Sequence, residues 1–406
     1  MMRQMSEDEA VVGPFLSRFS RRTTSGAFIP EIDGLRFIAI AMVVVAHVGN
    51  RVFSEVFVDP NVFGGWAPTD PLLRMTAGGM YGVEFFFVIS GFVLALPFAS
   101  CYLYGTRQVR LGSYYLRRVT RLEPPYLLSL TLILLLSAAF LDKSFSQMLP
   151  HFFAGTIYSH NVIFGRFNPV SFVTWSLEVE IQFYLVVPLL VSVFRIRHVV
   201  ARRGVIVGAA LTAMLVQSLC ITNGSRLSLT LLNFVQYFLM GFLLADVYLS
   251  RSQIDKAVSW RWDLAWAGAG LLLVVAMPSA RLGAWLFPFA AFLICLSAFR
   301  GPLARRFTRN PWIFTIGGMC YSIYLLHVIT ITFAIQLTKS ASLGNHIDAN
   351  LILQVILLLP FVLAVSALFF VLVERPCMNK RWPQDLAARM KARRPSRRTF
   401  RADRLT

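Results

Sequence analysis

The sequence predicts an all-α, polytopic membrane protein with about ten transmembrane helices and both termini in the cytoplasm. Three observations predict this fold class. The 406 residues are 56% hydrophobic and only 15% charged, whereas soluble domains carry about 25% charged residues. Ten stretches approach the roughly 20 apolar residues that a spanning helix needs. The basic residues alternate from one connecting loop to the next.

The ten predicted spans follow one another along most of the chain. The third, seventh and eighth are short, and the aromatic segment from Pro150 to Phe164 is expected to be interfacial or re-entrant because it is too short to span. The opening residues lack the apolar core and cleavage site of a signal peptide, so none is expected. The spans cover residues 35–55, 79–99, 123–141, 171–194, 204–221, 227–249, 263–278, 282–299, 312–337 and 350–373.

The loop charges predict the orientation. Of the 39 Lys and Arg residues, 31 fall in segments that share a side with the N-terminus, seven fall in the opposite loops, and Arg36 opens the first span. Because cytoplasmic loops carry the excess of basic residues, both termini are predicted to be cytoplasmic. We expect a cytoplasmic segment over 1–30, a transmembrane domain over 31–376, and a disordered basic tail over 377–406 that lies on anionic lipid.

The net charge of +19 therefore indicates orientation, and no nucleic-acid partner is expected. The five cysteines have no CxxC spacing and mostly lie in or beside spans. They are interpreted as small apolar residues, so neither a disulfide framework nor a metal site is predicted.

Several ionisable residues lie inside the predicted spans, where charge is costly and usually functional. At 1.5 Å per residue, their depths place them in one layer in the outer half of the membrane. Imidazoles and carboxylates buried together provide the groups for general acid–base chemistry. The structural alternative is a hydrogen-bond network that only fixes helix packing. These residues are His47, Glu84, Glu178, Glu180 and His327.

Arg36, Arg118 and Arg121 form a second group on the predicted cytoplasmic side. Arg118 and Arg121 share a helix face at a spacing of three residues. Arginines at this depth are usually positive-inside anchors. Alternatively, they bind phosphate, for which the guanidinium fork is suited.

These residues lie in motifs with a common order. The motifs are Glu31-Ile-Asp-Gly-Leu-Arg36 with His47 eleven residues after Arg36, Gly82-Val-Glu-Phe-Phe-Phe-Val-Ile-Ser-Gly91, Arg118-Val-Thr-Arg121, Trp175-Ser-Leu-Glu-Val-Glu-Ile-Gln-Phe-Tyr184, Cys320-Tyr-Ser-Ile-Tyr-Leu-Leu-His327 and Glu374-Arg-Pro376. From about Glu31 to Pro376, the chain resembles the acyltransferase-3 family of integral membrane O-acyltransferases. Members of this family modify bacterial surface polysaccharides, lipopolysaccharide, Nod factors and some macrolides.

The chain departs from the family pattern at four positions. Glu84 stands where Asp is usual, Glu178 where a small hydroxyl residue is common, Ile181 where Glu is common, and Cys320 where Ser is common. Glu180 is favoured as the functional carboxylate because it occupies the family's acidic position. Some relatives carry a C-terminal SGNH esterase-like domain. The sequence ends 30 residues after Pro376, so that domain is not expected.

The resemblance implies an enzyme of the bacterial cytoplasmic (inner) membrane, with no permanently bound cofactor. It implies transfer of an acyl group, most often acetyl, from cytoplasmic acyl-CoA to a hydroxyl of a surface polysaccharide, lipid-linked glycan or glycoside. His47 would act as general base, oriented by Glu180 or Glu84, and Arg36, Arg118 and Arg121 would bind the CoA phosphates. The supporting residues would be Trp175, Glu178, Tyr184, Tyr324, His327 and Glu374.

Other functions stay open. A proton-coupled transporter also buries carboxylates and imidazoles, although the sequence shows neither an inverted repeat nor paired broken helices. A structural subunit, another type of membrane acyltransferase, and a relay through an acyl-enzyme are further alternatives. The sequence does not predict the acyl group, the acceptor or the oligomeric state.

Overall fold

The apolar segments form helices because a helix pairs its backbone N–H and C=O groups within one segment, as hydrocarbon surroundings require. The computed structural model describes residues 13–21, 28–55, 76, 78–222, 224–250, 258–276, 280–343, 346–379, 382 and 384, and these contain helices and no strands. The predicted all-α class is therefore confirmed. Residues 1–12 and most of the predicted tail lie outside the described residues, and the location of the termini stays a prediction.

Eight helical segments of the described chain are long and apolar enough to cross a membrane. This identifies a multi-pass membrane protein. The segments lie in α2 (Pro30–Glu55), η2 (Gly79–Tyr81) with α4 (Gly82–Tyr104), α5 (Leu111–Phe140), α8 (Thr174–Leu190) with η3 (Val191–Arg195), α9 (Val199–Cys220), α12 (Ala280–Arg300), α15 (Cys320–Thr338), and α16 (Ile347–Phe369) with η7 (Phe370–Glu374) and α17 (Arg375–Cys377).

The two remaining predicted spans correspond to shorter helices, α10 (Val235–Leu249) and α11 (Trp260–Ala276). The stretch predicted to begin at 227 starts instead with two 3₁₀ turns, η4 (Arg226–Leu229) and η5 (Leu231–Asn233). The Thr230 hydroxyl donates to the Leu227 carbonyl, and the Asn233 amide donates to the Ser228 carbonyl. Such local side-chain bonds to the backbone compete with a regular helix.

Three other boundaries differ from prediction. Helix α5 begins twelve residues before position 123, so Arg118 and Arg121 lie on a helix. The predicted span 312–337 is divided at Met319 into α14 (Pro311–Gly318) and α15, because the low helix propensity of two successive glycines ends α14. The aromatic segment before span four forms α6 (Phe145–Thr156) and α7 (His160–Phe164). The remaining helical elements of the described residues are η1 (Leu16–Arg18) and α13 (Pro302–Thr308).

Helices α4 and α10 pack closely against each other in the core. A Cβ added at Gly91 would lie 2.2 Å from the Phe238 carbonyl oxygen, and one at Gly241 would lie 2.3 Å from the Val88 carbonyl oxygen. Only glycine allows backbones to approach this closely. Beside this contact, the Phe238 ring stacks on Phe87 and Phe183, with centroid separations of 4.7 and 3.8 Å.

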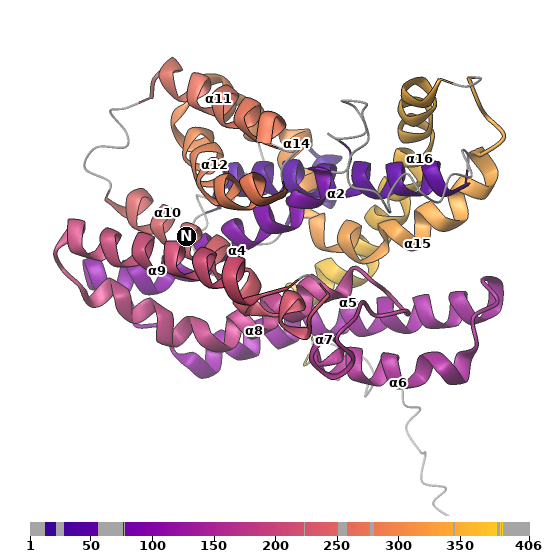
Figure 1. Ribbon diagram of the computed structural model, residues 1–406, viewed down its shortest axis with the longest axis horizontal. Helices are drawn as coiled ribbons and strands as arrows, with labels where there is room; N and C mark the ends of the chain where they lie inside the picture. The colour runs from indigo at the N-terminus through magenta and orange to yellow at the C-terminus, as the bar shows by residue number, and fades with distance from the viewer. Residues whose placement is uncertain are drawn as a thin grey trace, which may run out of the picture.

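Helix α2 packs against both early and late parts of the chain. It contacts α4 on one side and α14, α15 and α16 on others. Figure 1 shows the indigo α2 beside the orange α15 and α16, although hundreds of residues separate them in the sequence. Val44 and Val48 belong to the same buried apolar cluster as Ile323 and Ile331. This packing brings motifs from the two ends of the chain together.

Candidate active site

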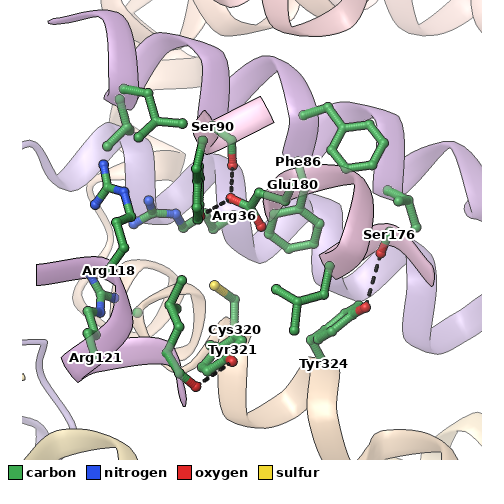
Figure 2. Close-up of a pocket in the computed structure, with 18 of the residues that line it drawn as sticks. Arg36, Phe86, Ser90, Arg118, Arg121, Ser176, Glu180, Cys320, Tyr321 and Tyr324 are labelled. Carbon is green, nitrogen blue, oxygen red and sulfur yellow. Dashed lines mark hydrogen bonds between the residues drawn. The ribbon is translucent and has the colours of Figure 1, made fainter. Parts of the chain in front are cut away.

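The three arginines singled out in the sequence line one cavity, together with a fourth, Arg21. We call it the arginine cavity, and counted with its open mouth it encloses about 1040 Å³. Figure 2 shows Arg36, Arg118 and Arg121 at one end and Ser176 with Tyr324 at the other. The cavity therefore has a basic end and a neutral, hydroxyl-bearing end.

The guanidinium groups of this cavity are held with part of their hydrogen-bonding capacity unused. The Asp33 carboxylate pairs with both Arg21 and Arg36. The guanidinium carbon of Arg118 lies 5.0 Å from the ring centroid of Tyr114 and 5.1 Å from that of Tyr184. Within the described residues, the buried Nε atoms of Arg21, Arg118 and Arg121 have no hydrogen-bond partner. These donors remain for an anionic ligand.

Arg21 lies outside the membrane-spanning segments, and its pKa reflects the positive charges that surround it. Burial, with the neighbouring charges of Arg121 and Arg36, lowers the pKa of Arg21 to about 9, although Asp33 acts in the opposite direction. Its guanidinium still carries its charge at neutral pH. Sequence reasoning missed Arg21 because it precedes the first span and lies in no motif. Asp33, in the motif that opens the first span, was the only available signal.

Glu180 lines the arginine cavity and links two helices. It accepts hydrogen bonds from the Ser90 hydroxyl at 2.7 Å and the Tyr184 hydroxyl at 2.6 Å. At the far end of the cavity, the hydroxyls of Ser176 and Tyr324 are 3.0 Å apart. The Tyr324 hydroxyl also donates to the Val173 carbonyl. These contacts join α15 to α8 where the cavity ends.

His47 and His327 form a buried hydrogen-bonded pair. Nδ1 of His47 lies 2.9 Å from Nε2 of His327. Nδ1 of His327 lies 2.9 Å from the carbonyl oxygens of both Ile323 and Tyr324. The His47 and His327 residues are 5% and 0% exposed. One hydrogen bond thus joins α2 to α15, although His47 and His327 are 280 residues apart in the sequence.

The backbone carbonyls determine the tautomers of the two neutral rings. His327 must carry its proton on Nδ1 to donate to a carbonyl, so its Nε2 accepts. His47 must then donate from Nδ1, which leaves a lone pair on its Nε2. That Nε2 has no hydrogen-bond partner among the described residues. The pair is therefore arranged to leave one basic nitrogen available on His47.

His47 also lines a second cavity, which we call the histidine cavity. Its lining residues are His47, Asn50, Arg51, Phe172, Val328 and Ile331. The Phe172 ring meets the His47 ring edge to face, with centroids 5.1 Å apart. His327 lies three residues, and so about one helical turn, after Tyr324 of the arginine cavity. The histidine pair thus lies close to both cavities.

The hydrogen-bond partner of His47 differs from the one inferred from depth. Glu180 bonds to Ser90 and Tyr184. Glu84 lines neither cavity, and its buried Oε2 has no partner among the described residues. The side chain that bonds to His47 is therefore that of His327 rather than a carboxylate. Depth along a helix does not determine which way a side chain faces around the axis, and this explains the difference. A catalytic role for either carboxylate stays a prediction.

Some of the other predicted residues line the arginine cavity, and the rest line neither cavity. Tyr184 and Tyr324 line the arginine cavity. Trp175 packs against Phe234, with centroids 5.2 Å apart. Glu178 accepts from the Asn161 backbone N–H at 2.8 Å, and Glu374 accepts from the Ser322 backbone and hydroxyl. Among the described residues, no group of three or more His, Cys, Asp or Glu side chains is arranged to hold a metal.

Comparison with known proteins identifies the family of the chain. A model of the acyltransferase domain family matches residues 29–371. The chain belongs to the acyltransferase-3 family. O-acetyltransferase OatA of Staphylococcus aureus is 25% identical over 335 residues, covering 76% of this chain and 51% of OatA. Peptidoglycan O-acetyltransferase OatA of Listeria monocytogenes is 28% identical over 187 residues, covering 43% of this chain and 26% of that protein.

The chain spans about half the length of the Staphylococcus aureus relative. No solved structure matches it. Both relatives are named O-acetyltransferases, and the Listeria monocytogenes protein is named for peptidoglycan.

Proposed function

We propose that this protein is an O-acyltransferase of the bacterial cytoplasmic membrane, which transfers an acyl group, acetyl in the first instance, from acyl-CoA to a carbohydrate hydroxyl. Membership of the family supports the reaction class. The name of one relative, a peptidoglycan O-acetyltransferase, supports a carbohydrate acceptor. The observation that carries the proposal is Nε2 of His47, which has no hydrogen-bond partner among the described residues and belongs to a ring that pairs with His327 and lines the histidine cavity.

The arginine cavity is the proposed donor site. CoA carries several phosphates, and guanidinium groups bind phosphate through two parallel hydrogen bonds. Three of the four arginines have an Nε donor without a partner in the described part of the chain. When the CoA phosphates bind at this basic end, the pantetheine arm of CoA would extend toward Ser176 and Tyr324. The thioester would then approach the histidine pair from the Tyr324 side.

His47 is the proposed general base. As the acceptor oxygen attacks the thioester carbon, its proton moves to Nε2 of His47 and a carbon–oxygen bond forms. The carbon–sulfur bond then breaks, and the leaving sulfur takes the proton from His47 as CoA departs as a thiol. The products are an O-acyl ester, free CoA and a neutral His47. Positioned proton transfer of this kind typically contributes about 10²–10⁴-fold in rate.

Two measurements test this function. In the first, the purified chain is reconstituted in liposomes with [¹⁴C]acetyl-CoA, and release of CoA and labelled glycan is followed. We expect release of CoA to depend on the added glycan. In the second, mass spectrometry compares surface glycans and secreted glycosides of cells with and without the chain, and a gain of 42 Da per acetyl group is expected. Absence of both signals would contradict the proposal.

A further inference from the structure

The histidine cavity is walled by three elements that meet at His47. Helix α2 contributes an amide and a guanidinium, α15 contributes two aliphatic side chains, and the segment before α8 contributes an aromatic ring. These residues are Asn50 and Arg51, Val328 and Ile331, and Phe172. Binding sites for small molecules combine apolar and aromatic walls with a few polar groups that fix the orientation of the ligand.

Phe172 lies where this cavity meets a neighbouring one. It lines the histidine cavity and also a second cavity, whose lining includes the uncharged polar residues Ser137, Asn168 and Ser171. The Phe172 ring is half-buried and lies edge to face with His47. Part of an aromatic ring is therefore accessible to a ligand that lies next to the proposed base.

Hydrogen bonds on both sides of Phe172 fix the backbone that carries its ring. The Thr174 hydroxyl donates to the Ser171 carbonyl at 2.8 Å. On the other side, the Tyr324 hydroxyl of α15 donates to the Val173 carbonyl. A surface that is already ordered before a ligand arrives loses little entropy on binding.

Asn50 presents hydrogen-bonding groups that the described residues leave unused. Its side chain is exposed, and its amide makes no hydrogen bond within the described part of the chain. Because Asn50 follows His47 by three residues on α2, the two side chains are neighbours on one face of the helix. The amide offers two N–H donors and a carbonyl acceptor, which suit a hydroxyl that both donates and accepts.

We propose that the acceptor is a pyranose sugar, whose ring packs its C–H face on Phe172 while Asn50 hydrogen-bonds a hydroxyl beside the one that is acylated at His47. This inference rests on the proposed function, because it identifies how the same site recognises its acceptor. A pyranose carries hydroxyls around its edge and C–H groups on its faces. The negative face of an aromatic ring attracts such C–H groups.

These two contacts would orient the sugar. Together with the reacting hydroxyl they fix three points of the ring, so one hydroxyl is presented to the base. The neighbouring cavity would give room for the next sugar of a longer glycan.

The test compares sugar rings with open chains that carry nearly the same hydroxyls. The pairs are N-acetylglucosamine with its reduced form, N-acetylglucosaminitol, and glucose with glucitol. Their dissociation constants are measured by NMR on the full chain in nanodiscs, without acyl-CoA. We expect at least one ring to bind about threefold to tenfold more tightly than its open chain, because only the ring presents a C–H face. Saturation of the aromatic protein signals should transfer to the C–H protons of that ring.

Variants connect this preference to the two residues. Phe172→Leu keeps an apolar side chain and should lose the preference for the ring, whereas Phe172→Tyr should keep it. Phe167→Leu is the matched control, because Phe167 belongs to the same segment, is exposed and lines neither cavity. In Asn50→Ala we expect the sugar ring to bind about threefold to tenfold more weakly, because one hydrogen bond is lost. Thermal unfolding verifies that each variant is folded.

Failure of this proposal is distinguishable from failure of the proposed function. Equal binding of ring and open chain in both pairs, no binding of either ring, or no transfer from aromatic signals would overturn the pyranose site. A ring preference that survives in Phe172→Leu, or an unchanged affinity in Asn50→Ala, would do so too. Release of CoA in the liposome assay would meanwhile still support the acyltransferase. The sugar measurements contain no donor, so they report on the acceptor site alone.

Discussion

At the scale of single residues, the neighbours of His47 determine what its ring can do. Two backbone carbonyls require the His327 proton on Nδ1, and this requires the His47 proton on its own Nδ1. The available nitrogen is then Nε2. A carboxylate would have oriented the ring in the same way and added a negative charge. With His327 in this place, the pair is neutral, which suits a buried site.

His327 is therefore a positioning residue with a measurable effect. Replacing it by leucine removes the acceptor for Nδ1 of His47, and we expect kcat to fall on the order of 10–100-fold, with the KM for acetyl-CoA unchanged. His327→Gln, whose amide oxygen can accept, should retain more activity than His327→Leu. Steady-state kinetics check both parameters. Equal losses in the two variants, or a rise in KM alone, would argue against this role.

Arg121 tests the donor site. It lines the arginine cavity, and its buried Nε has no partner within the described residues. In Arg121→Gln we expect the KM for acetyl-CoA to rise about tenfold, because a charge-assisted bond to phosphate is lost, while kcat changes little. Arg110→Gln, an exposed arginine at the start of α5, is the matched control. A KM that stays unchanged in Arg121→Gln would remove this residue from the donor site.

At the scale of elements, two features depend on close contacts between helices. The first is the contact of α4 with α10 through Gly91 and Gly241. It positions Ser90, which donates to Glu180 in the arginine cavity. The second is the α6–α7 segment, in which His151 Nδ1 lies 2.9 Å from His160 Nε2. Asn161, next to His160, is bonded to Glu178 of α8.

Gly91→Ala tests the first feature. The added Cβ would lie 2.2 Å from the Phe238 carbonyl oxygen, so α4 and α10 must separate. We expect a loss of about 1–3 kcal/mol in the free energy of unfolding, as for other overpacked cores. Gly208→Ala in α9 meets no atom within 4 Å and should be neutral or slightly stabilising. Thermal unfolding in detergent compares the two, and equal effects would contradict the packing argument.

The pH dependence of the α6–α7 segment tests the second feature. Burial, and next the charge of His151, lowers the pKa of His160 from 6.5 to about 4. Since the folded state disfavours the proton, the stabilisation is complete above about pH 6.5 and is lost progressively as pH falls toward 4. We expect hydrogen-exchange protection factors of residues 151–164 to decrease over this range. In His160→Gln the decrease should be much smaller, and an unchanged decrease would exclude His160 as its cause.

At the scale of the whole molecule, two cavities lie close to one buried histidine pair. The composition and span lengths predicted the all-α membrane fold, because apolar length alone decides whether a helix can cross hydrocarbon. The spacing of Arg118 and Arg121, together with the position of Arg36, predicted a cluster that the arginine cavity contains. These predictions succeed because each pattern lies within one segment of the sequence or depends only on the side of the membrane on which a loop lies.

The parts that could not be predicted depend on how helices rotate and pack. The partner of His47 was inferred from depth, yet the rotation of α8 directs Glu180 toward Ser90. Arg21 joins the cavity through contacts that link positions before the first span to α2.

The most direct test of the central claim is a single-turnover measurement on His47→Ala. The full chain and the variant, both reconstituted in liposomes, are mixed with limiting [¹⁴C]acetyl-CoA and a peptidoglycan-derived glycan, and acetyl ester and free CoA are counted over time. We predict that His47→Ala remains folded, binds acetyl-CoA normally, and transfers acetyl at least about 10²-fold more slowly. Transfer by His47→Ala at the rate of the unmodified chain would contradict the account.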